Sequence, residues 1–483
     1  MRKSSFERVI AEQGQLVYTH VGDSMQPLIQ PGDLLVIKKV GAPLKKYDIP
    51  LYRRKSGQYV LHRIVGVRDD SYITMGDNRS APEYGVTEKM IIGVLTDIVR
   101  DGQTLSADAL SRKLRLKNAL DLMYLISCAL SETAPDLRRC RGMYTKSVLR
   151  LAAAQGLLSA AAFALEMITE LPHGLDQVKK KAIRKIALFD IERSKILADF
   201  EKHSIRYCPL KGIVLKQCYP KLGMREMSDN DILCDPSCMT EIKAIMEAHG
   251  YTCTDFGHYY HDSYTKPPTL EFEMHRALFN EDEMPQLAEA FRNIHSRLIG
   301  EGCARQMTDG DCYLYMICHM YKHHIHNGTG LRNLADIAAF TKRHDLSPYR
   351  AYLDDALDAL GLSDFERRIR ELALCLFSGG EPDQPQEELL LALAEAGVYG
   401  NEDTAYDNRI ARSLHGDHSR RSKLRYYGRR IIPDQDFLKK SYPFVYRHRA
   451  LYPLLILYRP IRGVLTHPKG ILREIRKVAG FKK

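Results

Sequence analysis

The spacing of apolar residues changes near residue 114, and this change constrains the fold more than any other feature of the sequence. Between residues 15 and 100, short runs rich in Val, Ile and Leu, such as QYVLHRIVGV (58–67), are separated by Gly, Pro, Asn and Asp, as in strands joined by turns. From 114 to 204 the apolar residues recur at helical spacing, and the pattern is helical again after residue 285. A chain of 483 residues is also too long for one ordinary core.

We therefore predict a multidomain protein, in which a small all-β domain is followed by a helix-rich α+β domain. The expected boundaries are residues 1–104 for the β domain, 105–114 for a polar linker, 115–408 for the second domain with helical parts at both ends, and 409–483 for a basic helical segment. Within the second domain, strands and helices are expected to mix over residues 205–279.

Positive charge is concentrated at the C-terminal end of the chain. From Arg409 onward there are 20 Lys and Arg against 4 Asp and Glu, a net charge of +16, so the total of +11 leaves the preceding 408 residues at −5. A solvated helical face explains this charge, and so does a polyanion or an anionic membrane surface as partner. The Tyr and Leu residues between the arginines of 441–465 favour a position at a membrane interface.

The sequence predicts a cytoplasmic protein. The N-terminus has no apolar run suited to a signal peptide, and the apolar stretch 450–465 is interrupted by Pro453 and Pro460, short of the roughly 20 residues that a membrane span requires. The 11 cysteines are odd in number and include no CxxC pair, which favours a reducing compartment over a disulfide scaffold. The basic segment would then lie at the inner membrane face if it contacts lipid.

Three residues of the β domain suit nucleophilic catalysis. Ser24 lies three residues before Pro27, in a segment that cannot form a regular helix, so a constrained turn would expose its hydroxyl. Serine needs a base within hydrogen-bonding reach, and His62 stands among apolar residues of a predicted strand. Asp77, in a Gly-Asp-Asn turn, is a candidate to orient the imidazole. Taken alone, three such residues are also compatible with chance.

The sequence around these residues resembles that of a known superfamily. GDSMQPLIQPGDLLVI (22–37), VLHRIVGV (60–67) and MGDNRS (75–80), in this order, are similar to the signal peptidase type I and LexA-like serine peptidases. The resemblance covers roughly residues 15–100. It implies a small β peptidase domain that hydrolyses a peptide bond through an acyl-enzyme.

By this resemblance Ser24 is the nucleophile, His62 the general base and Asp77 the orienting acid. The base in this superfamily is often a lysine, and the His-Arg-Ile form is similar to the variant that works with Ser, His and Asp. Signal peptidases are anchored in membranes, and this chain has no expected anchor. A cytosolic peptide, or a segment of a partner protein, therefore fits better as the substrate than an exported preprotein does.

A second chemistry is indicated by Asp229 and Asp231. Residues two apart on a strand point the same way, so these aspartates would form a paired carboxylate face. Two carboxylates that close disfavour joint ionisation unless a cation lies between them. Oxygen ligands on one face suit Mg²⁺, whose coordination shell substrate phosphates would complete.

A third carboxylate is expected from the strand TLEFEMHRAL (269–278). There Glu271, Glu273 and His275 share one face. Lys211 and Arg225 are cations placed to meet a triphosphate.

The same segments resemble the uncharacterised bacterial nucleotidyltransferase family of the polymerase-β type. The resemblance rests on PLKGIVLKQCYP (209–220), MREMSDNDILCD (224–235) and LEFEMHRAL (270–278), and it extends over roughly residues 115–470. It implies Mg²⁺ as cofactor, an NTP as substrate, and transfer of NMP to an acceptor.

The resemblance also implies roles for individual residues. The metal ligands would be Asp229, Asp231 and Glu273, and the nucleotide contacts would be Lys211, Gly212 and Arg225. Aminoglycoside-modifying relatives carry Gly-Ser where this chain has Lys211-Gly212, so the phosphate cradle is expected to differ.

Four histidines lie close together on a predicted helix. His319 and His323 are one turn apart, with His324 and His326 beside them. This spacing suits a metal pair, packing or hydrogen bonding, or a role near the acceptor pocket.

We predict a bifunctional cytoplasmic enzyme, a serine endopeptidase fused to a Mg²⁺-dependent nucleotidyltransferase, which together act in the maturation of a peptide. Two alternatives remain open. Either the transferase alone is active and the N-terminal domain is a peptide-binding module, or the protein is a non-catalytic adaptor.

Overall fold

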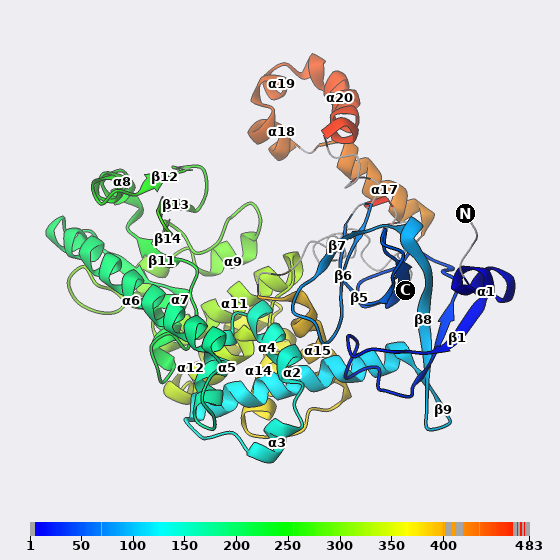
Figure 1. The fold of residues 1–483 in the computed structure, drawn as a ribbon. Coiled ribbons are helices and arrows are strands. Elements are labelled where there is room, and N and C mark those ends of the chain that lie inside the picture. Colours follow the sequence, from blue (N-terminus) through cyan, green and yellow to red (C-terminus); the bar gives the residue numbers. More distant parts are fainter. Residues whose placement is uncertain are drawn as a thin grey trace. The chain divides into compact units, whose positions relative to one another are not determined.

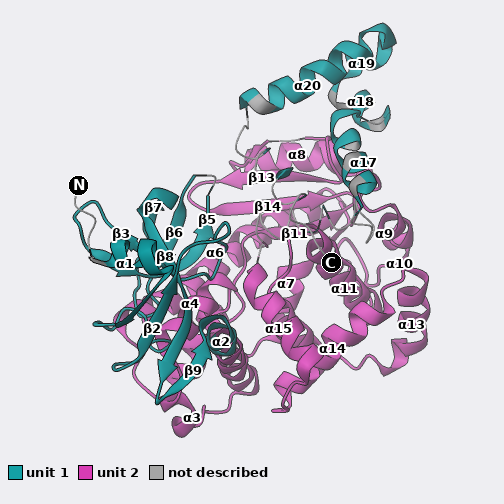
Figure 2. Ribbon diagram, turned by 90° about the vertical axis from the view of Figure 1, so that its right-hand side faces the viewer, with its two compact units in different colours: residues 1–114, 401–483 teal, residues 115–400 magenta. Residues whose placement is uncertain are grey.

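The computed structural model describes residues 5–68, 70–254, 256–398, 400, 408, 410, 419–433, 435–466, 471, 474, 475 and 478. The chain divides into two compact units, residues 1–114 with 401–483, and residues 115–400 (Figure 2). Within the described ranges, no helix is both long and apolar enough to cross a membrane. A β-rich N-terminal region followed by a helix-rich region confirms the predicted order of fold types.

The N-terminal part of the first unit consists of a short helix, α1 (Ser5–Gln13), and two antiparallel sheets (Figure 1). The larger sheet has the order β1-β2-β8-β3-β4, with β9 paired to β8. Its strands are β1 (Gln15–Thr19), β2 (Leu34–Lys38), β3 (Pro50–Arg53), β4 (Tyr59–Leu61), β8 (Ile91–Arg100) and β9 (Gln103–Ser106). The smaller sheet is formed by β5 (Arg63–Val67), β6 (Tyr72–Met75) and β7 (Glu83–Val86).

Alternating burial explains why these segments form strands. In β2, Leu35 and Ile37 are fully buried while their neighbours are more exposed, as expected for a sheet that covers a core with one face. Met25 and Ile29, from the segment that carries Ser24, belong to the same core. This burial anchors the Ser24 segment against the larger sheet.

The expected linker at residues 105–114 does not form. β9 ends at Ser106, and helix α2 (Ala107–Ser131) begins at the next residue and continues into the second unit. The polar composition suggested a loop, but Ala, Leu, Arg and Lys are good helix formers, and Ala107 is buried in the β-domain core.

The second unit is largely helical (Figure 1). Besides α2, its helices are α3 (Leu137–Arg141), α4 (Thr145–Ala154), α5 (Leu158–Glu166), α6 (His173–Lys202), α7 (Lys211–Leu215), α8 (Met239–Ala248), α9 (Pro285–Ala290), α10 (Ile294–Arg297), α11 (Asp309–His326), α12 (Arg332–Arg343), α13 (Arg350–Ala359), α14 (Ser363–Phe377) and α15 (Gln384–Ala396).

A five-stranded sheet lies within this unit, in the order β10-β11-β14-β13-β12. Its strands are β10 (Tyr207–Pro209), β11 (Asn230–Cys234), β12 (Thr252–Cys253), β13 (His261–Lys266) and β14 (Leu270–His275). β11 and β14 pair in parallel, and the other pairs are antiparallel.

The two faces of this sheet have different surroundings. Ile232 of β11 and Phe272 of β14 pack into one apolar core with residues of α6 and α8. Leu233 belongs to the other core, which includes residues of α11 and α12. Because side chains alternate along a strand, Asp231 and Glu273 lie on this second face. The sheet therefore presents its carboxylates away from α6 and α8.

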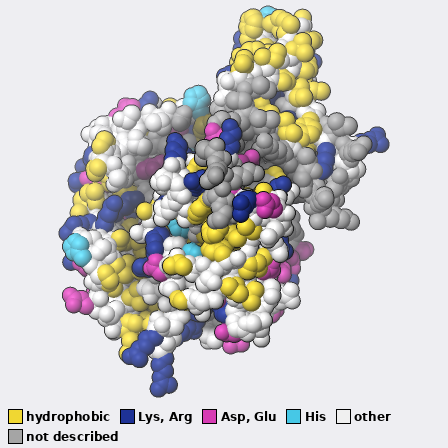
Figure 3. All heavy atoms as spheres, turned by 45° about the vertical axis from the view of Figure 1, so that its right-hand side comes forward, with side chains coloured by type: hydrophobic (Ala, Val, Ile, Leu, Met, Phe, Trp, Pro, Cys, Tyr) yellow, Lys and Arg dark blue, Asp and Glu magenta, His cyan; other side chains and the backbone are white. Residues whose placement is uncertain are grey.

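The described part of the basic C-terminal segment is helical. It contains α17 (Arg420–Ile431), α18 (Gln435–Ser441), α19 (Pro443–Arg447) and α20 (Tyr452–Thr466). Apolar side chains gather on the surface of this segment (Figure 3). In α20, Leu454, Leu457, Ile461 and Leu465 recur at helical spacing and are each at least 60% exposed. Residues 411–418 and 467–470 of the predicted basic segment lie outside the described residues.

Candidate functional site

The pairing of β11 with β14 brings two predicted metal ligands together. In the parallel register, Asp231 lies opposite Glu273. Asp229, immediately before β11, lines the same cavity of about 310 Å³ as these two residues do. The three predicted carboxylates, which are 44 residues apart at most, thus converge on one cavity.

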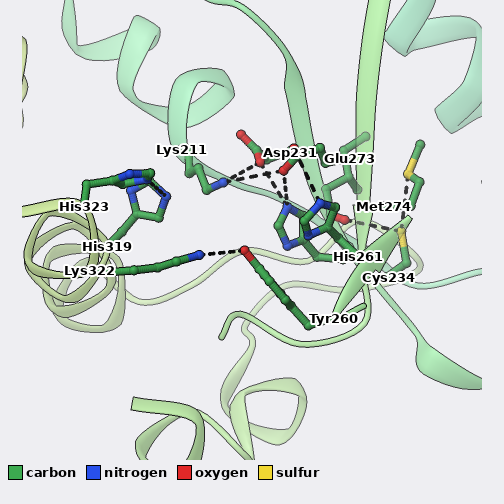
Figure 4. Close-up of polar contacts among 12 residues, drawn as sticks. Lys211, Asp231, Cys234, Tyr260, His261, Glu273, Met274, His319, Lys322 and His323 are labelled. Atoms are coloured by element: carbon green, nitrogen blue, oxygen red, sulfur yellow. Dashed lines mark hydrogen bonds and ion pairs between the residues drawn. The ribbon is translucent and has the colours of Figure 1, made fainter. Parts of the chain in front are cut away.

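Lys211 meets these carboxylates from the start of α7 (Figure 4). Its Nζ donates to Asp231 Oδ1 at 2.6 Å and lies 3.9 Å from Glu273 Oε2. The preceding Leu210 is fixed to β11, because its N–H donates to the Asp231 carbonyl at 2.9 Å. Lys211 itself has a φ of +43°, a left-handed conformation that is unfavourable for a residue with a side chain.

Two histidines complete the polar cluster. His275, which is 1% exposed, places Nε2 3.0 Å from Asp231 Oδ1 and 3.3 Å from Glu273 Oε2. His261, from the neighbouring strand β13, places Nε2 3.6 Å from Glu273 Oε1. The sequence placed His275 on the carboxylate face, but it offered no signal for His261, which the antiparallel register of β13 brings there.

The pKa values of three groups that line the cavity, Asp231, Lys211 and Asp229, are shifted in different ways. Burial raises the pKa of Asp231, but Lys211 and a hydrogen bond from His275 outweigh burial and hold this pKa well below its usual range. Burial lowers the pKa of Lys211, and the charge of Asp231 more than compensates, so this pKa lies well above its usual value. Burial, followed by the charge of Asp231, raises the pKa of Asp229 to about 6. Asp229 therefore has negative charge that a divalent cation would stabilise.

Arg225, predicted as a nucleotide contact, is engaged elsewhere. Its Nε and Nη2 donate to the two oxygens of Asp336 in α12 at 2.8 and 2.9 Å, and Tyr219 also donates to this carboxylate at 2.8 Å. The pair is buried and both of its residues line the cavity, so the guanidinium connects α12 to the cavity wall, and its contact with a nucleotide stays a prediction. Asp336, 111 residues away from Arg225, carried no sequence signal.

Gly212 is restricted by this arrangement. A Cβ at this position would lie 3.0 Å from Arg225 Nη1 and 3.1 Å from the Met227 side chain. The glycine lines the cavity beside Lys211 and lets the Arg225 guanidinium approach the backbone of α7.

His319 and His323 line the same cavity from α11 (Figure 4). Their Nε2 atoms are 3.2 Å apart and share a hydrogen bond. Burial, followed by the charge of Lys211, holds the pKa of His319 well below its usual value, and burial with Lys322 lowers the pKa of His323 to about 4. Both rings are therefore neutral at pH 7, and hydrogen bonding is the alternative that the geometry favours.

Ser24 and His62 line a separate cavity of about 600 Å³ in the first unit. Gly76 lies close to both, since a Cβ there would be 2.6 Å from the Ser24 carbonyl oxygen and 3.0 Å from His62 Nε2. Asn78 N–H donates to the Ser24 carbonyl at 2.9 Å, which fixes the turn beneath the serine. Burial lowers the pKa of His62, so its imidazole is neutral at pH 7.

Asp77, predicted to orient His62, is paired with Arg63. Arg63 donates through Nε and Nη2 to the two oxygens of Asp77 at 2.8 and 2.7 Å, in a pair that is buried from solvent. The Nδ1 atom of His62 is buried and has no hydrogen-bond partner among the residues that the structure describes. Among the described residues, the hydrogen bond from His62 Nδ1 to an orienting acid is therefore not formed, and the role of Asp77 as that acid stays a prediction.

The comparisons with known proteins concern the second unit. No curated protein and no solved structure gives a match to the chain. Residues 144–378 match the family model described as uncharacterised nucleotidyltransferase, which includes the carboxylates and Lys211 but neither Ser24 nor His62. Residues 144–378 are therefore similar to a nucleotidyltransferase family that is described as uncharacterised.

Proposed function

We propose that residues 144–378 transfer NMP from an NTP to an acceptor hydroxyl. The acceptor oxygen would form a bond to the α-phosphorus, the bond between the α-phosphorus and its bridging oxygen would break, and pyrophosphate would leave. The hydroxyl proton would be lost from the acceptor. The observation that carries the proposal is the convergence of Asp229, Asp231 and Glu273 beside Lys211 in one cavity.

The carboxylates suit a Mg²⁺ ion, and Asp229, Asp231 and Glu273 would hold it. Two observations support the fit. The ammonium of Lys211 already lies against Asp231 and Glu273, so the site accommodates a positive group. Burial and then the charge of Asp231 raise the pKa of Asp229 despite the nearby Lys211, so a cation at Asp229 would stabilise its ionised form. When bound, the ion would supply charge neutralisation and alignment of the substrate phosphates.

The remaining residues divide into contacts and supports. Lys211 and Gly212 are the proposed nucleotide contacts, because both line the cavity and the ammonium can exchange Asp231 for a phosphate. Arg225 is proposed as a positioning residue through Asp336. The neutral histidines of α11 provide an uncharged polar wall, which suits a neutral hydroxyl acceptor.

A second proposal concerns the β domain. Ser24 and a neutral His62 border one cavity at close quarters with Gly76, and this supports the expected peptide hydrolysis by the serine. The unpartnered His62 Nδ1 supports the alternative, a peptide-binding module without cleavage. Because NTP and Mg²⁺ are plentiful in the cytoplasm, we propose that both domains act there on one peptide, which is trimmed and nucleotidylated.

We also propose that the basic segment contacts an anionic membrane surface. An exposed apolar face on α20 that includes Leu457 and Ile461, in a segment of net charge +16, is the composition of an interfacial helix.

Substitution of the paired aspartates tests the transferase. Asp229→Asn and Asp231→Asn should each lower transfer of label from α-phosphate-labelled NTP to cell-extract acceptors by about 10²–10³-fold, because each removes a charge at the reacting phosphates. Asp235→Asn, at the other end of β11 and outside the cavity, is the matched control and should retain activity. Equal activity of the wild type and the three variants would contradict the proposed transfer reaction and leave the alternative of a non-catalytic adaptor.

Cation binding should depend on pH through Asp229. A proton competes with the cation for this carboxylate, whose pKa is about 6. Lowering the pH from 7.5 to 5 should therefore weaken Mg²⁺ binding by about tenfold in calorimetric titrations. Asp229→Asn should bind Mg²⁺ more weakly than wild type at both pH values, and its affinity should change less with pH. If its affinity changed with pH as much as that of wild type, another group would be responsible for the pH dependence.

Peptide mass comparison tests the serine. Wild type and Ser24→Ala are incubated with peptides extracted from the source cells, with Ser56→Ala, an exposed residue that is not among those that line the cavity, as control. Fragments released by wild type and Ser56→Ala only would establish cleavage. If wild type, Ser24→Ala and Ser56→Ala give the same peptide masses, the alternative of a peptide-binding module is favoured. The proposal of a shared substrate would then require that a peptide bound by this module become nucleotidylated.

Vesicle flotation tests the basic segment. The protein should bind vesicles that contain phosphatidylserine, release in high salt, and bind neutral vesicles weakly. Leu457→Asp with Ile461→Asp should reduce binding. Stronger binding to duplex DNA than to these vesicles would instead make a polyanion the partner.

A further inference from the structure

Glu273 lies between two imidazoles on one face of a two-stranded ribbon. β13 and β14 pair antiparallel with His261 opposite His275, and Glu273 precedes His275 by two residues on the same strand. Alternation along β14 therefore puts all three side chains on one face. One ligand atom from each of them lies within 4.8 Å of the others.

The spacing of these atoms matches that of ligands around one small ion. Two ligands at the usual zinc distances of 2.0–2.2 Å on a tetrahedral centre are about 3.4 Å apart. The observed separations are 3.3 Å from Glu273 Oε2 to His275 Nε2 and 3.6 Å from Glu273 Oε1 to His261 Nε2, so they describe a carboxylate that faces the ion with both oxygens. The two nitrogens meet different oxygens of the carboxylate, so Glu273 has an oxygen facing each ring.

We propose that His261, Glu273 and His275 form a binding site for a divalent first-row transition ion beside the Mg²⁺ position of Asp229, Asp231 and Glu273, with Glu273 shared by the two positions. Imidazole nitrogens bind such ions well, whereas Mg²⁺ prefers a shell of oxygens. Glu273 borders both positions. This proposal is based on the geometry of β13 and β14, and it does not depend on whether the proposed transfer reaction occurs.

The surroundings predict that the ion exchanges readily. The Nδ1 atoms of His261 and His275 are buried and have no hydrogen-bond partner among the described residues. Metal-binding histidines usually donate this second N–H to an acceptor, and loss of that contact weakens binding by 10–100-fold. The ammonium of Lys211, 3.9 Å from Glu273, opposes a second positive charge. The ion therefore binds reversibly.

Cobalt titration of the full-length protein tests the site. Co²⁺ is added to protein freed of metal with a chelator, and the visible absorption of the bound ion is followed. Wild type should give the spectrum of an imidazole- and carboxylate-bound ion, which millimolar Mg²⁺ does not abolish. His261→Ala should bind at least about tenfold more weakly. Thiolate binding by one of the 11 free cysteines would instead give a strong near-ultraviolet band.

The controls separate the outcomes. His203→Ala removes an exposed histidine that pairs with Glu241 outside the cavity, and it should bind like wild type. His261 is only half-buried, so His261→Ala is expected to fold, which thermal unfolding checks. Wild-type binding by His261→Ala would overturn the proposal and leave the two rings as polar neighbours of Glu273 without a metal role. If Co²⁺ binds as expected while no protein transfers NMP, the transfer reaction fails and the metal site stands.

Discussion

The repulsion between two carboxylates held side by side is the constraint on which the second unit depends. Parallel pairing of β11 with β14 fixes Asp231 opposite Glu273, and Asp229 adds a third negative group to the same cavity. Like charges so close would oppose folding unless a positive group or a hydrogen-bond partner lies near them. Lys211 and His275 both reach Asp231 Oδ1, which explains why a lysine at the start of α7 and a buried histidine belong to this cluster.

A second buried ion pair, between Arg225 and Asp336, connects the site to helix α12. Arg225 follows the turn before β11, and its bidentate contact with Asp336 connects the sheet to α12. Removing one partner of such a pair typically costs about 3–5 kcal/mol, because the other charge stays buried. Arg63 with Asp77 has the same form in the β domain. In both domains, therefore, an arginine near the candidate site stabilises the fold through a buried ion pair.

Sequence reasoning succeeded where local periodicity carries the information. Alternation along β11 and β14 places Asp231 and Glu273 on one face, whereas Asp229 lies just before β11, and the change of period near residue 114 predicted the order of fold types. Local patterns do not carry the partners that a side chain finds through tertiary packing. The pairing of Arg225 with Asp336 and that of Asp77 with Arg63 are of this kind. His261 was missed because only the register of β13 brings it to Glu273.

The backbone at Lys211 shows what this cavity requires of the chain. A left-handed conformation at a non-glycine residue costs about 1–3 kcal/mol and persists only where the surroundings impose it. Glycine at this position would relieve that strain, yet it would leave the buried Asp231 carboxylate without its ammonium, and losing one partner of a buried ion pair typically costs about 3–5 kcal/mol. The ion pair therefore outweighs the backbone strain, and stability and the proposed function make the same demand on this residue. Selection for thermal tolerance alone would be expected to keep the lysine, as selection for activity would.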